Sequence, residues 1–166
     1  MNLEPGTNIT VTVSVTLDPT RLMTASSRFP VATHILVALH WNEGTLLSSE
    51  QLAYTVNTNP VVIRRVMGLL RKAGLVTTLA GAHGGSQLAK RPDEITLLAV
   101  YRAVEETALF RLHCPSETCA LGGVIEPTLK PIYARAEDAM EQVLAGVTVA
   151  QVSQDARMQA GLETEE

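Results

Sequence analysis

The feature that most constrains the fold is a cationic helix followed directly by a glycine-rich turn. Residues 60–76 read PVVIRRVMGLLRKAGLV, and a proline at the start suits the first turn of a helix, where its missing N–H costs nothing. Ile63, Val66 and Leu70 recur at helical spacing and predict one buried face. The opposite face consists of Val61, Arg64, Arg65, Gly68, Arg71 and Lys72. Such a helix packs on one side and presents cations on the other.

A shorter helix is predicted just before it. The stretch SSEQLAYTVN, residues 48–57, offers Ser48 and Ser49 as N-cap candidates and turns Leu52 and Ala53 inward. A short turn of Asn57, Thr58 and Asn59 follows, and Gly74 fits the end of the cationic helix. Two helices joined by a short turn, with the cations on the second, describe a helix-turn-helix.

The glycine-rich turn completes a winged helix. LVTTL (75–79) and SQLA (86–89) are short strand candidates on either side of AGAHGG. Glycine permits positive φ and lets the backbone approach a groove closely, and His83 at the tip can donate to a phosphate or reach into a minor groove. A plain surface hairpin with a polar tip is the alternative. The expected fold is mainly α with a small β-hairpin wing.

Further helices are expected on both sides of this unit. Residues 29–41 form a first helix with Val31, Ile35, Leu36 and Leu39 on one stripe. Thr96 caps a fourth helix that ends near residue 107, and a long fifth helix follows residues 122–123. Pro127 and Pro131 predict that this helix begins late or bends. Residues 148–154 form a last short helix with Thr148 as its cap.

The fifth helix carries an apolar seam. Its members follow a heptad-like spacing of four and three: Ile125, Leu129, Ile132, Ala136, Ala139, Val143 and Gly146. An ordinary buried face would also explain this pattern. Because Tyr133, Met140 and Leu144 form a second apolar set, we expect the helix to pack both inward and against a second copy of the chain.

The distribution of charge is uneven. The chain carries a net charge of −4, yet residues 51–92 contain no Asp or Glu and hold six Lys and Arg residues. One positive face on an acidic molecule is typical of a protein that binds a polyanion. Solvated clustering of charge without a partner is the alternative.

The linker between the fourth and fifth helices holds both cysteines. Cys114 and Cys119 in LHCPSETCALGG are close enough for a disulfide within the loop if the geometry allows. With His113 they offer three potential metal ligands, and zinc needs a fourth, whereas an iron–sulfur cluster needs more thiolates than one chain offers. Inert packing, thiol redox sensing and metal binding all stay open.

Other classes of protein find little support. The two cysteines fit a reducing cytoplasm, and no apolar run approaches the roughly 20 residues that span a bilayer. The N-terminus lacks the cationic start of a secretory signal. No phosphate-binding loop, HExxH zinc motif or serine elbow is present, so no enzymatic activity is expected.

The chain divides into four expected segments. Residues 1–25 alternate like a lone strand and form an N-terminal arm, an exchanged strand or a translated leader, with Met23 as a possible natural start. Residues 26–92 form the winged helix-turn-helix, and residues 93–152 the cysteine loop and dimerisation helices. Residues 153–166 form a C-terminal tail.

These stretches resemble the Rrf-two family of winged helix-turn-helix transcriptional regulators. The matching segments span about residues 26–152 in order: SSRFPVATHILVAL, SSEQLAYTVNTNPVVIRRVMGLLRKAGLVTT, GAHGGSQLAKRPDEITLLAVYRAVEE and CALGGVIEPTLKPIYARAEDAMEQVLAGVTVAQV. The resemblance implies a homodimer that binds a palindromic operator in double-stranded DNA, with the late helix crossing to the partner. A bacterial repressor is the expected role.

The resemblance also assigns candidate DNA contacts. The helix-turn-helix contributes Ser49, Asn59, Pro60, Val61, Arg64, Arg65, Arg71 and Lys72, and the wing contributes Gly81, Ala82, His83 and Gly84. Arg64 and Arg65 are expected to contact bases or phosphates in the major groove, and Arg71 and Lys72 the DNA backbone. The wing is expected in the minor groove.

Three departures from the family pattern bear on function. The wing begins Ala80-Gly81 where the family often has Arg-Gly, and Ser86 replaces an aromatic residue. Cluster-binding members carry three cysteines in the loop, whereas this chain has two at a closer spacing, so the CALGG stretch resembles the cluster-free subgroup, in which a loop thiol can respond to oxidants. A winged-helix module that binds protein instead of DNA, an iron–sulfur or metal sensor and a regulator with a small-molecule pocket are the alternatives.

Overall fold

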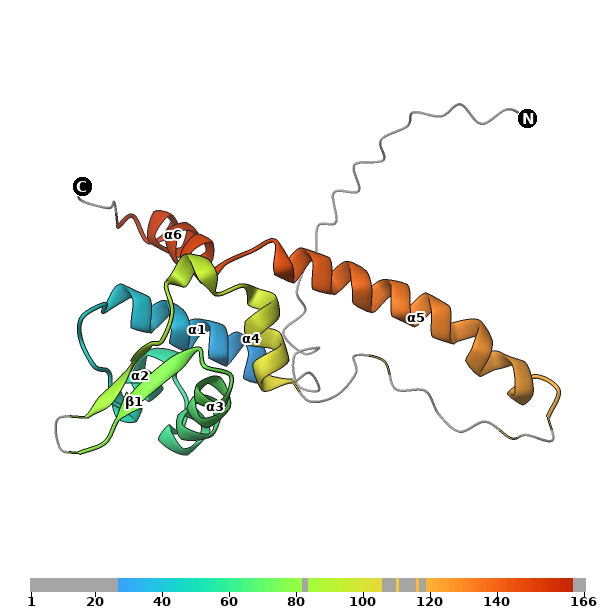
Figure 1. Cartoon of the computed structure of the whole chain (residues 1–166), viewed down its shortest axis with the longest axis horizontal. Coiled ribbons are helices and arrows are strands. Elements are labelled where there is room, and N and C mark those ends of the chain that lie inside the picture. The colour runs from blue at the N-terminus through green and yellow to red at the C-terminus, as the bar shows by residue number, and fades with distance from the viewer. Residues whose placement is uncertain (1–26, 82–83, 106–109, 111–115, 117–118, 163–166) are drawn as a thin grey trace, which may run out of the picture.

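The computed structural model describes residues 27–81, 84–105, 110, 116 and 119–162. Its elements in chain order are α1 (Arg28–Trp41), α2 (Ser49–Val56), α3 (Pro60–Lys72), β1 (Val76–Leu79), β2 (Gly85–Leu88), a short 3₁₀ turn η2 (Pro92–Glu94), α4 (Leu97–Val104), α5 (Gly122–Ala145) and α6 (Val149–Gln159). This order confirms the prediction of a mainly helical chain with one small hairpin (Figure 1).

One hydrophobic core joins α1, α2, α3, α4 and α6. Its fully buried large side chains are Ile35, Leu36, Leu52, Ile63, Val66, Leu70, Val76, Ile95, Val100, Val104 and Val149. The predicted inward faces of the first three helices are therefore confirmed, except that Val31 is only partly buried. This packing fixes the direction in which the opposite face of α3 points.

Local capping sets where α2 and α3 begin and end. Ser48 caps α2, and its hydroxyl and the Gln51 side chain each accept a hydrogen bond from the other's backbone N–H. Asn57 adopts a left-handed conformation (φ 54°) and turns the chain, and Asn59 caps α3 by accepting a hydrogen bond from the Val61 N–H at 2.8 Å. The predicted helix-turn-helix therefore forms from side chains that specify it locally.

The hairpin is an antiparallel pair that also contacts the segment before α2. Val76 pairs with Leu88 and Leu79 with Gly85, and Ser86 makes a bridge to Leu47. A Cβ atom at Gly85 would lie 2.8 Å from the Cβ of Leu46, so glycine is required where β2 crosses this segment. The wing is thus fastened to the helix-turn-helix at its base.

Helix α5 differs from its prediction because it begins early. It runs without interruption from Gly122 through both Pro127 and Pro131, so the expected late start is wrong. Both prolines lie on the exposed side of the helix, where the carbonyl groups left without an N–H partner can be hydrated. The Thr128 hydroxyl also donates to the Val124 carbonyl at 2.7 Å in this stretch.

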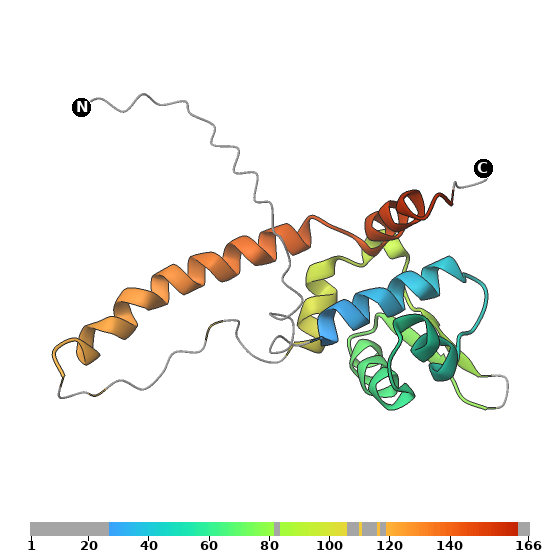
Figure 2. The ribbon, with the colours of Figure 1, turned by 180° about the vertical axis from the view of Figure 1, so that it is seen from behind.

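Helix α5 extends away from the core, and α6 returns to it (Figures 1 and 2). Trp41 at the end of α1 donates to the buried Ser153 hydroxyl of α6 at 2.8 Å, and the Arg157 guanidinium lies 5.3 Å from the centre of the Trp41 ring. Residues 153–159, expected as the start of a tail, therefore continue this helix. No helix in the described part of the chain has the length and apolar character to cross a membrane.

Candidate nucleic-acid interface

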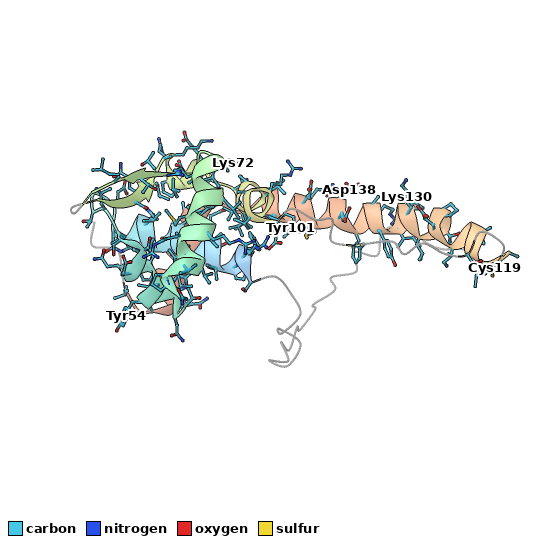
Figure 3. All side chains as sticks on the ribbon, turned by 90° about the horizontal axis from the view of Figure 1, so that it is seen from below. Tyr54, Lys72, Tyr101, Cys119, Lys130 and Asp138 are labelled. Atoms are coloured by element: carbon cyan, nitrogen blue, oxygen red, sulfur yellow. The ribbon has the colours of Figure 1, made fainter. Side chains whose placement is uncertain are left out.

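The outer face of α3 is an exposed cationic surface. Val66, Met67 and Leu70 pack into the core on one side. The residues on the other side are all exposed: Val61, Val62, Arg64, Arg65, Gly68, Arg71 and Lys72. Figure 3 shows α3 across the front of the domain, with Lys72 labelled at one end of the helix. The face predicted from the sequence is the face that the fold leaves open to a partner.

The N-terminal end of α3 presents exposed groups on this surface. Pro60 opens the helix, and Val61 beside it is 65% exposed although it is apolar. The side-chain oxygen of Asn59 is used as the helix cap, which leaves its amide N–H₂ as a donor. Ser49 lies half-buried in the first turn of α2, so it has less surface to offer than the other candidates.

Arg64 has a partner that the sequence did not reveal. Its terminal nitrogen lies 2.6 Å from a carboxylate oxygen of Glu50, in the first turn of α2, and both side chains are more than half exposed. The pKa of Glu50 lies below its usual value, chiefly because its carboxylate accepts a hydrogen bond from its own backbone N–H, with Arg64 adding to the effect. The carboxylate stands one residue before the acid-free stretch and contributes a negative charge to its surface.

The other cations of α3 are not neutralised in this way. Arg65, Arg71 and Lys72 form no ion pair with any residue that the structure describes. Arg91, beyond the wing, is held by Asp93 through two contacts of 3.1 and 2.7 Å. Unpaired, exposed cations attract phosphate groups, because neutralising DNA releases its condensed counterions.

The turn at the start of the wing has a backbone conformation that favours glycine. Gly81 has φ of 117°, and the Gly84 N–H donates to its carbonyl at 3.0 Å. His83, the predicted tip residue, and Ala82 lie outside the described residues. Of the four wing residues predicted to contact DNA, the structure therefore describes Gly81 and Gly84.

Tyr54 is an interface candidate that the sequence reasoning missed. It lies on α2 and is 88% exposed, the largest exposed fraction among the large apolar side chains of the described residues. Figure 3 labels it at the outer edge of the domain. The sequence could have indicated this exposure, because Tyr54 directly follows the inward-facing Leu52 and Ala53. A tyrosine hydroxyl at this place can donate to a phosphate.

The cysteine site lies at the other end of the molecule. Cys119 is exposed and free, immediately before α5, and is labelled in Figure 3 at the tip of that helix. Hydrogen bonds from the backbone N–H groups of Gly122 and Leu121 hold the pKa of its thiol below the usual value. Cys114 and His113 lie outside the described residues. Within the described ranges no three His, Cys, Asp or Glu side chains gather as a metal site.

The predicted apolar seam of α5 is largely exposed. Ile132 and Val143 are 54% and 67% exposed, Ala136 and Ala139 are also exposed, and Ile125 and Leu129 are partly exposed. The side facing the chain's own domain is instead the second apolar set, Tyr133, Met140 and Leu144, which is half-buried. The rings of Tyr133 and Phe110 stack with 4.7 Å between their centres. A carboxylate oxygen of Glu141 lies 2.6 Å from a terminal nitrogen of Arg102 on α4.

A helix-turn-helix with a hairpin fastened beside it and a cationic outer helix defines a winged helix-turn-helix protein. Comparison with known families agrees. The model of the Rrf2 family, described as iron-dependent transcriptional regulators, matches residues 25–155. The chain belongs to the Rrf2 family of transcriptional regulators, as its sequence resemblance implied.

Individual relatives are similar over most of their length. The Bacillus subtilis protein YwnA, named as an HTH-type transcriptional regulator, is 43% identical over 76% of this chain and 95% of its own. The structure of CymR, the global cysteine regulator of B. subtilis, is 26% identical, with a TM-score of 0.60 over 80% of this chain and 98% of that one. The oxidized form of Staphylococcus aureus CymR is also 26% identical, with a TM-score of 0.60 over 79% and 96%.

Proposed function

We propose that this regulator is a homodimer that binds an inverted-repeat operator in double-stranded DNA and acts as a bacterial repressor. The observation that carries the proposal is the outer face of α3, where Arg65, Arg71 and Lys72 are exposed without an ion-pair partner among the described residues. The N-terminal end of α3 enters the major groove, and the wing lies in the neighbouring minor groove. Because bacterial DNA lies in the cytoplasm, the proposed location of the protein is the cytoplasm.

The proposed dimer is supported by the exposure of helix α5. This helix has 24 residues, two internal prolines and no buried side chain among the described residues. Helices gain most of their stability from packing an apolar face, and proline in a helix interior removes a backbone hydrogen bond. The exposed seam from Ile125 to Val143 therefore packs against the same seam of a second copy. Two α3 helices are then presented together, and an operator occupied by such a dimer is closed to RNA polymerase.

Selection from a random double-stranded DNA pool tests this function directly. With the purified full-length chain, we expect the enriched sequences to contain an inverted repeat whose half-sites lie about one or two helical turns apart. An enriched single half-site would contradict the dimer. No enrichment over the starting pool at low salt would overturn the DNA-binding function and favour a winged-helix module that binds protein.

A resident iron–sulfur cluster does not fit the donor set of this chain. The family description names iron, but the sequence supplies two cysteines, and Cys119 is exposed at the start of α5. Such clusters are ordinarily held by four Cys thiolates, and the cluster-binding members of the family carry three cysteines in this loop, so two cysteines fall short of both sets. The proposed regulator accordingly works without a cofactor, with a thiol as its sensing group.

Cys119 is the proposed sensor of oxidants. Its thiol pKa is lowered, so more of it is thiolate at neutral pH, and it is accessible to small oxidants. Attack of the thiolate on peroxide gives a sulfenic acid, which a second thiol such as Cys114 can convert to a disulfide with loss of water. The turn before α5 is tight, because a Cβ at Gly122 would overlap the Ser116 carbonyl. Oxidation there is proposed to shift α5 and the spacing of the two α3 helices.

Peroxide should therefore weaken operator binding in the native chain and not in a Cys119→Ser variant. The expected loss is about tenfold, within the usual range of coupling between two sites. Fluorescence anisotropy on the selected operator measures it, and an absorption spectrum of the same preparation checks for a cluster. A Cys114→Ser variant shows whether the second thiol is needed. Unchanged affinity with both thiols demonstrably oxidised would rule out the sensor.

A further inference from the structure

The ion pair between Glu50 and Arg64 stands on the proposed DNA-binding face itself. It joins the first turn of α2 to the second turn of α3, with 2.6 Å between a carboxylate oxygen of Glu50 and a terminal nitrogen of Arg64. The two side chains are 64% and 57% exposed, so the pair projects from the surface that also presents Val61 and Arg65. It is formed before any partner binds.

A carboxylate in the first turn of α2 stabilises the positive end of that helix, but this role does not require its contact with Arg64. Exposed ion pairs contribute little to folding, because water screens them and both side chains lose freedom. A negative charge on a surface that meets phosphates also opposes binding. Residues 51–92 contain no Asp or Glu, so Glu50, one position before them, is a negative charge beside a cationic surface.

The geometry of the pair leaves Arg64 able to act. One terminal nitrogen donates to Glu50, and this is the single hydrogen bond of the guanidinium among the described residues. Arginine has five N–H donors in a planar fork, so the remaining donors stay available. Guanine presents two acceptors, O6 and N7, at the spacing that such a fork matches.

We infer that Glu50 is a specificity-determining residue, which holds Arg64 in a fixed orientation for reading a guanine in the major groove and keeps it from swinging to a phosphate. This role depends on the function proposed above. Glu50 lowers the overall attraction for DNA and raises the preference for the correct base. Its carboxylate stands at the start of α2, 2.6 Å from the terminal nitrogen of Arg64, so the arginine is held from the neighbouring helix.

A Glu50→Gln variant of the full-length chain tests this role. We expect it to bind DNA of unrelated sequence more tightly than the native chain. Its preference for guanine at one position of each half-site should fall about tenfold, as expected when a bidentate contact is no longer enforced. The slope of log affinity against log salt should steepen by about 0.9 for each arginine that moves to a phosphate. Anisotropy titrations on the selected operator and on operators with that guanine replaced measure all three.

Two further variants make the result specific. Glu126→Gln removes the same charge from an exposed position on α5, and it should change neither the base preference nor the slope. In an Arg64→Ala background, Glu50→Gln should have no effect on base preference, because the group it orients is gone.

The outcomes separate the two proposals. If Glu50→Gln weakens all sequences equally, or leaves preference and slope unchanged, Glu50 has no part in specificity. A melting temperature measured on each variant shows whether a uniform loss reflects damage to α2. If the native chain itself shows no sequence preference, the DNA-binding function fails and not merely the role of Glu50.

Discussion

Alanine at Arg64 is expected to weaken binding to the selected operator by about 1–3 kcal/mol, or roughly 5- to 150-fold. The same change should cost much less on unrelated DNA, because a base contact is lost only where the base is present. Arg65 has no ion-pair partner among the described residues. If Arg65 reads a base, Arg65→Ala should lower the affinity mainly for the operator, and if it contacts phosphate, Arg65→Ala should lower the affinity for all DNA sequences. Anisotropy titrations on operator and scrambled duplexes separate these two cases.

Lys72→Ala provides the matched control for these arginines. Lys72 lies at the C-terminal end of the same exposed face, where a contact with the DNA backbone is expected. Its removal should weaken operator and scrambled DNA by similar factors and reduce the salt slope by about 0.9 for each lost phosphate contact. If Arg64→Ala and Arg65→Ala both bind the operator normally, α3 is not the recognition helix.

The core of the winged helix could be predicted because its signals are local. The apolar spacing of Ile63, Val66 and Leu70 and the cap at Asn59 each act within one or two turns of helix. Gly81 of the hairpin acts in the same way, since its positive φ is a local property of the turn. These short-range features specify where α2, α3 and the strands begin and end.

The pair between Glu50 and Arg64 could not be predicted in this way. The two residues are 14 positions apart, and their contact depends on the angle at which α2 meets α3. In the sequence, Glu50 falls one residue before the acid-free stretch, yet in the structure it lies on the same surface as that stretch. The exposed Tyr54 illustrates the same limit, because its exposure depends on how the helices pack around α2.

The late helix shows a third kind of limit. Its two apolar sets were recognised, but periodicity alone does not say which one faces the chain's own domain. The structure leaves Tyr133, Met140 and Leu144 half-buried and exposes the heptad seam from Ile132 to Val143. The two prolines predicted a late start, but α5 runs through both of them, and both are exposed, so water can reach the carbonyl groups that lack an N–H partner.

Charges placed in that seam should divide the proposed dimer. In a variant with both Ala136→Asp and Ala139→Asp, each seam brings two carboxylates against its symmetric partner, where they lose water without gaining a cation. Burying unpaired charges costs several kcal/mol, so the dimer is expected to weaken by roughly 100-fold or more. Sedimentation equilibrium should show the mass falling from two chains towards one. Operator affinity should fall with it, because two half-sites are no longer bound by one molecule.

The control must carry the same charges on the same helix without touching the seam. Ala134 and Ala145 are exposed residues of α5 that lie on the side opposite the seam, so Ala134→Asp with Ala145→Asp matches the seam variant in residue type and charge. The matched pair should remain dimeric and should bind the operator with at most a small loss from added negative charge. If both variants stay dimeric, the seam is not the interface; if both dissociate, the helix itself has been destabilised. Only dissociation of the seam variant alone, with loss of operator binding and an unchanged melting temperature of the core, assigns the exposed apolar set of α5 to a second copy of the chain.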